Sequence, residues 1–143
     1  PLVQEITIKV SGCPNGCGHH HLGAIGLQGA SVKSGLAEIP CYDIFLGGGN
    51  YTGGGGKFGT RVTRVPAKRA PQAVRKIIQV YLDERQDGEP FLDFVDRVGP
   101  KSFDPLLNEF KDVGPVHEEI DVYMDWGKDE MFEVVRGEGE CSV

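Results

Sequence analysis

The chain has 143 residues, 39% of them hydrophobic and 25% charged, which is enough to bury the core of one globular domain. Its formal net charge of -6 argues against a nucleic-acid partner, because such proteins present a basic surface. No apolar run is long enough to span a bilayer, and no signal-peptide pattern opens the chain. We therefore expect neither a nucleic acid nor a membrane among its partners.

Four stretches predict β-strands. Residues 4–10 alternate polar and apolar side chains and include β-branched residues, which favours a half-buried strand. Further strands are expected over residues 24–33, 41–46 and 60–65. Ser34-Gly35 is typical of a turn, and Pro66 ends the last strand.

Helical periodicity follows the strands. The clearest helix begins at Pro71 and ends at Asp87-Gly88, with an apolar stripe of Val74, Ile77, Ile78, Tyr81 and Leu82. Shorter helices are expected over residues 90–97 and 103–110, and short strands or docking segments over 122–126 and 131–135. Strands followed by helices indicate an α+β fold, with a mixed or antiparallel sheet and helices packed on one face.

The most distinctive stretch is residues 11–21, Ser-Gly-Cys-Pro-Asn-Gly-Cys-Gly-His-His-His. Cys13 and Cys17 stand four positions apart on a Pro-Asn-Gly turn, and thiolates are soft ligands that suit iron–sulfur clusters, zinc or copper. Two thiolates alone complete neither a tetrahedral site nor a cluster site. The three consecutive histidines cannot all face one way on an extended chain, so we expect one to be partly buried and the others to lie at the surface.

This stretch resembles the second cysteine pair of the sirohaem-containing nitrite and sulfite reductases. In that family a four-iron cluster is held by a Cys-x5-Cys pair and, further along, by a Cys-x3-Cys pair in a Cys-Pro-Asn setting. The resemblance continues through residues 20–21, 25–30, 45–48 and 65–69. No Cys-x5-Cys pair occurs here, and the family places it upstream. The chain is therefore expected to be the C-terminal piece of such an enzyme.

The resemblance also divides the chain and implies its partners. Residues 1–111 would be the C-terminal half of the 4Fe-4S and sirohaem domain, and residues 112–143 a tail packed on that domain or on a missing neighbour. The implied partners are the remainder of the reductase polypeptide and an electron donor such as ferredoxin or a flavoprotein.

The activity that the resemblance implies is the six-electron reduction of sulfite to sulfide or of nitrite to ammonia. Cys13 would be an ordinary cluster ligand and Cys17 would bridge the cluster and the sirohaem iron, while Asn15, Gly47 and Gly48 would lie beside the cofactor. No catalytic acid is assigned, because the family's basic residues come largely from parts absent here. Since two of four ligands do not retain a cluster, the isolated chain is expected to lack both cofactors and to be inactive.

A rival hypothesis is a small zinc-binding structural module that uses Cys13, Cys17 and one or two of the histidines, although this spacing is cramped for one tetrahedral ion. The glycine-rich run 47–59 is not a phosphate-binding loop, because Tyr51 and Phe58 stand where that motif needs glycine and Ser or Thr. It is either a hairpin tip or a glycine wall against a large flat cofactor.

The remaining charged and sulfur-bearing positions carry weaker expectations. Lys68 and Arg69 are expected to be solvated, with contact to cofactor carboxylates as the alternative. No chemistry is assigned to Cys41 or Cys141, and Cys141 is expected to be an exposed free thiol. The placement of the cysteines predicts a reducing, cytoplasmic compartment.

Overall fold

A computed structural model describes residues 3–135, and its centre is a four-stranded sheet in the order β1-β2-β3-β6. The strands are β1 (Ile8–Ser11), β2 (Ile25–Ser34), β3 (Ala37–Leu46) and β6 (Thr60–Pro66). β1 runs parallel to β2, whereas β2 with β3 and β3 with β6 are antiparallel. The sheet is thus mixed.

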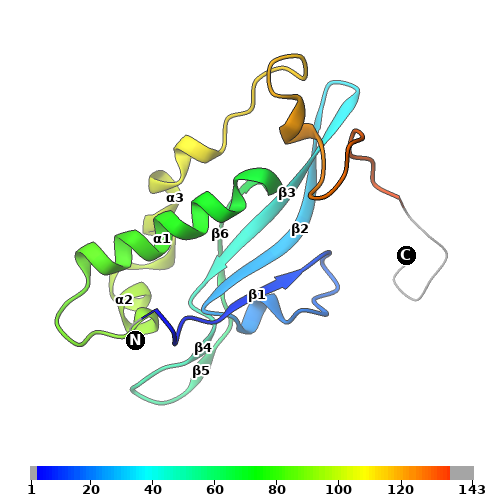
Figure 1. Cartoon of the computed structure of the whole chain (residues 1–143). Helices are drawn as coiled ribbons and strands as arrows, with labels where there is room; N and C mark the ends of the chain where they lie inside the picture. The colour runs from blue at the N-terminus through cyan, green and yellow to red at the C-terminus, as the bar shows by residue number, and fades with distance from the viewer. Residues whose placement is uncertain (1–2, 136–143) are drawn as a thin grey trace.

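Three helices lie together on one side of this sheet: α1 (Ala70–Glu84), α2 (Phe91–Val98) and α3 (Phe103–Leu106) (Figure 1). Their apolar side chains and those of the strands form one core, whose fully buried members include Ile25, Ile44, Leu46, Val65, Ile77, Tyr81, Phe94 and Leu107. Pro71 stands in the first turn of α1, as predicted. The predicted α+β class, with a mixed sheet and helices on one face, is confirmed.

Three expected elements differ in the structure. Residues 3–5 form a turn, so the first strand begins only at Ile8, and its apolar side chains Ile8 and Val10 are about half exposed because β1 is an edge strand. Leu82, expected in the core stripe of α1, is 41% exposed, and Ala73 is buried instead. The predicted third helix breaks after α3 into a separate 3-10 turn, Asn108–Phe110.

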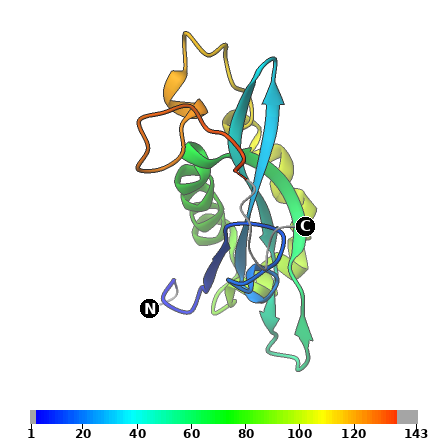
Figure 2. The same ribbon diagram turned by 90° about the vertical axis from the view of Figure 1, so that its right-hand side faces the viewer.

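The chain after α3 returns to the far end of the β2–β3 hairpin, as Figure 2 shows. A 3-10 turn, Ile120–Tyr123, places Val122 and Tyr123 in a second small core with Ile39 and Cys41. The Tyr123 hydroxyl is 3.0 Å from the Ser34 hydroxyl and donates to the Gly114 carbonyl. Residues 122–126 and 131–135 thus form no named strand within the described chain; they meet in one isolated bridge between Met124 and Met131.

The expectation that Arg69 is solvated is wrong. Its guanidinium donates to the carbonyls of Phe110 and Asp112 and to the Glu119 carboxylate at 2.9 Å, which ties residues 110–119 to the start of α1. Lys68 places its ammonium 4.8 Å from the centre of the Trp126 ring. Both cations therefore help to pack residues 110–126 against the rest of the domain.

The glycine-rich run forms a hairpin, the first of the two alternatives, from β4 (Gly49–Asn50) and β5 (Gly56–Lys57). It is docked on α2, because Thr52 donates to Asp93 at 2.7 Å and Lys57 pairs with Asp96 at 2.6 Å. No helix within residues 3–135 combines the length and the hydropathy needed to cross a membrane.

Candidate metal centre

The two cysteines lie in residues 12–24, which connect the parallel strands β1 and β2 and are called the crossover below. Cys13 is half-buried and Cys17 is exposed. The turn between them is closed by the Gly16 amide, which donates to the Cys13 carbonyl at 3.4 Å, and Gly16 has a φ of +73° that only glycine adopts easily. Both thiols thus stand on one tight, solvent-reaching turn at the edge of the sheet.

The return of this turn to the sheet is anchored by Ser11, the last residue of β1. The buried Ser11 hydroxyl accepts a hydrogen bond from the Gly18 amide at 3.1 Å and lies 2.8 Å from Nδ1 of His20. The His19 amide donates to the Gly16 carbonyl at 2.8 Å. The backbone on both sides of Cys17 is therefore held by hydrogen bonds.

Close backbone approach explains the glycines around the crossover. A Cβ atom on Gly18 would lie 1.8 Å from the Val10 carbonyl oxygen. A Cβ on Gly26 would lie 2.0 Å from the His20 carbonyl oxygen, and one on Gly29 the same distance from that of Gly12. These glycines therefore let the crossover lie directly on β1 and β2.

The three histidines separate as predicted, because His19 and His21 are exposed and His20 is buried. His20 is in fact 0% exposed, more buried than expected, at the start of a 3-10 turn, His20–Leu22. Burial lowers the pKa of its imidazole, the neighbouring His21 lowers it further, and Gln28 opposes the shift. The His20 and His21 ring centres lie 5.1 and 5.0 Å from that of Phe45.

The other predicted cofactor neighbours lie at the base and tip of the crossover. Asn15 is exposed between the cysteines. Gly48 is buried, and a Cβ there would lie 2.5 Å from the His21 carbonyl oxygen, so it presses the end of β3 against the crossover. Gly47 is buried with a φ of +92°, and its carbonyl accepts the Tyr51 hydroxyl at 2.6 Å. Backbone packing thus requires glycine at position 48.

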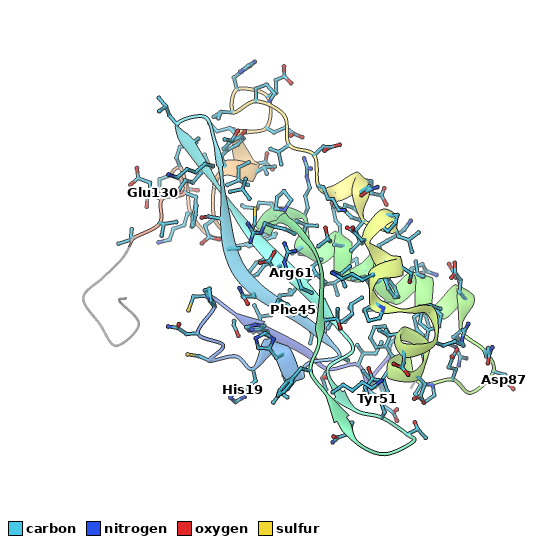
Figure 3. The ribbon with its side chains drawn as sticks, turned by 180° about the vertical axis from the view of Figure 1, so that it is seen from behind. His19, Phe45, Tyr51, Arg61, Asp87 and Glu130 are labelled. Atoms are coloured by element: carbon cyan, nitrogen blue, oxygen red, sulfur yellow. The ribbon has the colours of Figure 1, made fainter. Side chains whose placement is uncertain are left out.

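Sequence reasoning missed an ionic cluster of Asp43, Arg61 and Arg64. It lies on the sheet face opposite the helices, and Figure 3 shows Arg61 near Phe45. The Asp43 carboxylate, 5% exposed, accepts two hydrogen bonds from Arg64 and one from Arg61, each at 2.9 Å. Burial alone would raise the pKa of Asp43, but the hydrogen bonds and charges of Arg64 and Arg61 outweigh it and hold the pKa below its usual value. Because these residues are 18 and 21 positions apart, no local motif signals them.

Among residues 3–135, no three His, Cys, Asp or Glu side chains gather where they could hold a metal ion. The donors at the crossover are therefore two thiols, which fit half the ligand set of a four-iron cluster. Cys41 is no further donor at this place: it is buried, its thiol donates to the Ile39 carbonyl at 3.4 Å, and burial raises its pKa to about 11. Cys141 lies outside the described residues.

Residues 4–113 match the protein family described as the nitrite and sulphite reductase 4Fe-4S domain. The chain belongs to this family. The match covers the crossover with both cysteines, the whole sheet and the three helices. The predicted resemblance to the nitrite and sulfite reductases is thereby confirmed.

Individual members of the family are longer than this chain. The sulfite reductase [NADPH] hemoprotein beta-component of Bacillus subtilis is 35% identical over 101 residues, which are 67% of this chain and 15% of that protein. The protein of the same name from Anoxybacillus flavithermus is 38% identical over 97 residues, with the same coverage. The chain thus spans about a seventh of these relatives.

The fold is also similar to that of the Mycobacterium tuberculosis NirA protein, with a TM-score of 0.58 and 23% sequence identity. That match covers 69% of this chain and 18% of the NirA chain. At this identity the likeness shows a shared fold.

Proposed function

We propose that this chain is the part of a sirohaem and 4Fe-4S nitrite or sulfite reductase that supplies two thiolate ligands, Cys13 and Cys17, to the cluster. The observation that carries the proposal is the pair itself: two thiols on one solvent-reaching turn, with no third metal donor gathered beside them in residues 3–135. This chain spans 15% of the length of its relatives. Two further thiolates would come from the remainder of such a longer polypeptide.

A bound 4Fe-4S cluster would supply single electrons to the site where sulfite or nitrite is reduced. The contribution of this chain is to hold the two sulfurs in one orientation through the turn at Gly16 and the anchored amide of Gly18. Cys17 is the more exposed of the two, which leaves its sulfur accessible to a second group and supports its assignment as the ligand shared with the sirohaem iron.

The same proposal includes the remaining predicted cofactor neighbours and protein partners. Asn15, at the tip of the turn, and Gly47 and Gly48, at its base, would line the cofactor, and the other protein partners would be the remainder of the polypeptide and a ferredoxin or flavoprotein donor. With two ligands in residues 3–135, the isolated chain would be inactive and would bind neither cofactor. A reducing cytoplasmic compartment would keep both thiols available.

The test uses the full-length parent protein, purified anaerobically, with iron content, visible absorption and sulfite and nitrite turnover as readouts. Cys13→Ser and Cys17→Ser are expected to lose cluster iron and to abolish six-electron reduction. Cys41→Ser is the matched control, because Cys41 is buried in the second small core with Val122 and Tyr123, and a serine hydroxyl can keep the hydrogen bond to Ile39. Retained iron and turnover in Cys17→Ser would contradict the proposal.

The isolated chain provides a second test. After anaerobic incubation with iron and sulfide, it is expected to elute from a desalting column without bound iron. A stable brown chain with four irons would show that its own residues complete the site. Stoichiometric zinc in the colourless parent would instead support the structural zinc module.

A further inference from the structure

Two buried polar side chains, Ser11 and His20, lie behind the cysteine turn, and the function proposed above gives His20 no role. Ser11 is 3% exposed and His20 is 0% exposed, and both lie directly behind the turn that carries Cys13 and Cys17. His20 makes its one side-chain hydrogen bond through Nδ1, and its Nε2 is buried without a partner among the described residues. A buried imidazole with an unpaired nitrogen is less favourable than an apolar side chain of the same size. Filling space therefore does not by itself explain a histidine at position 20.

The contacts of the Ser11 hydroxyl link the Gly18 amide to the His20 ring. The Ser11 oxygen accepts the Gly18 N–H at 3.1 Å. The same oxygen lies 2.8 Å from Nδ1 of His20, which donates or accepts according to the tautomer of the imidazole. In either direction the hydrogen bonds connect the Gly18 amide, the Ser11 hydroxyl and the His20 ring, and each bond polarises the next.

This chain of bonds acts on both neighbours of Cys17. Gly18 is held by the Ser11 oxygen, and its Cα lies so close to the Val10 carbonyl that the backbone there has no room to shift inward. On the other side, Gly16 faces the His20 ring, because an added Cβ would lie 3.7 Å from its Cε1. The backbone after Cys17 is thus held by Ser11, and Ser11 is in turn held by His20.

We infer that Ser11 and His20 are positioning residues that hold the cysteine turn in one conformation before any ligand binds. This inference rests on the proposed function in one respect, the identity of the group that the two thiols bind. The preorganised turn itself follows from the contacts of this chain, and it reduces the conformational entropy lost when two thiolates are fixed on one cluster.

The first experiment measures amide hydrogen exchange of Gly18 by NMR in the 143-residue chain. Ser11→Ala is expected to accelerate exchange about tenfold, because the amide loses its acceptor. Ser11→Thr keeps a hydroxyl and is expected to restore protection. Ser102→Ala is the matched control, since its hydroxyl donates to the Gly99 carbonyl at 2.7 Å, far from the crossover. Unchanged Gly18 exchange in a folded Ser11→Ala chain would overturn the inference.

A second pair of variants separates hydrogen bonding from volume at position 20. Asparagine places an amide group near the site of Nδ1, whereas the longer glutamine places it near the site of Nε2. If the bond to Ser11 holds the turn, His20→Asn protects Gly18 better than His20→Gln. If the ring only fills space, the larger glutamine protects better, and the role of His20 is overturned.

The third measurement links the turn to the cluster in the full-length parent. Ser11→Ala and His20→Gln are expected to lose iron to a chelator several-fold faster than the unmodified protein, while Ser102→Ala does not. Faster Gly18 exchange without faster iron loss would overturn the positioning role. Cysteine variants that keep their iron would refute the proposed function alone, because the Gly18 measurement does not depend on a metal.

Discussion

The two faces of the sheet are built in different ways. On the helix side, Ile77, Tyr81 and Phe94 are fully buried and pack on the apolar side chains of the strands. On the other side, the crossover lies on the sheet through glycine backbone and the Ser11–His20 contact, and Asp43 is neutralised by two arginines. The folding free energy therefore comes mainly from apolar burial on the helix side. The other side has fewer apolar contacts, and its polar groups are held in defined positions by hydrogen bonds.

This difference teaches where chemistry can be placed on such a fold. An apolar face must stay closed to water to contribute to stability, so it leaves few polar groups free to bind anything. The opposite face and edge keep thiols, imidazoles and guanidinium groups accessible while the helix side holds the domain together. Three substitutions test this division, and the most destabilising comes first.

Phe94→Ala is expected to lower the free energy of unfolding by about 3–5 kcal/mol, because it opens a cavity in the middle of the helix-side core. Urea unfolding followed by circular dichroism measures the change. Leu106→Ala is the control, since Leu106 is 41% exposed, and its effect should stay within about 0.5 kcal/mol. Equal losses for both variants would show that the helix side does not dominate stability.

Gly26→Ala tests the backbone contact under the crossover. The added methyl group would lie 2.0 Å from the His20 carbonyl oxygen and 3.3 Å from the Phe45 Cβ, so we expect a loss of about 3 kcal/mol. The control is Gly53→Ala, where no atom lies within 4 Å of an added Cβ. Urea unfolding of both variants measures the difference. A Gly26 variant as stable as the control would mean that the crossover is not packed on β2 as described.

Asp43→Asn is expected to destabilise the protein by about 2 kcal/mol at neutral pH, because the carboxylate hydrogen bonds to Arg61 and Arg64 are weakened. The folded pKa of Asp43 is depressed, so its contribution is complete above the usual value of 3.8 and is lost as the pH falls through the lower folded pKa. The variant should therefore show a shallower acid loss of stability.

Urea unfolding between about pH 2 and pH 7 gives this measurement, because the loss occurs below the usual pKa of 3.8. Asp87→Asn, on the exposed turn after α1, is the control and should follow the unmodified protein. An identical acid limb for Asp43→Asn and the unmodified protein would show that the ion cluster does not contribute.

Features that depend on near neighbours along the chain could be predicted from the amino-acid sequence alone. The spacing of apolar side chains from Val74 to Tyr81 predicted α1, and the turn residues at Ser34-Gly35 predicted the β2–β3 hairpin. The Cys-Pro-Asn-Gly-Cys pattern predicted the family, which the match over residues 4–113 confirmed. Such signals are readable because helical and turn contacts join residues only a few positions apart.

Contacts between side chains and backbone groups that are far apart in the sequence could be seen only in the folded chain. Several features have no local sequence signature. They are the exposure of Leu82, the complete burial of His20, the ion pair between Arg69 and Glu119, and the ion pairs of Asp43 with Arg61 and Arg64. Long-range packing also explains Gly18 and Gly26, because their missing side chains make room for carbonyl groups of the chain itself. The physical reason is that glycine, arginine and histidine are each compatible with many surroundings, and the packing of distant strands selects one of them.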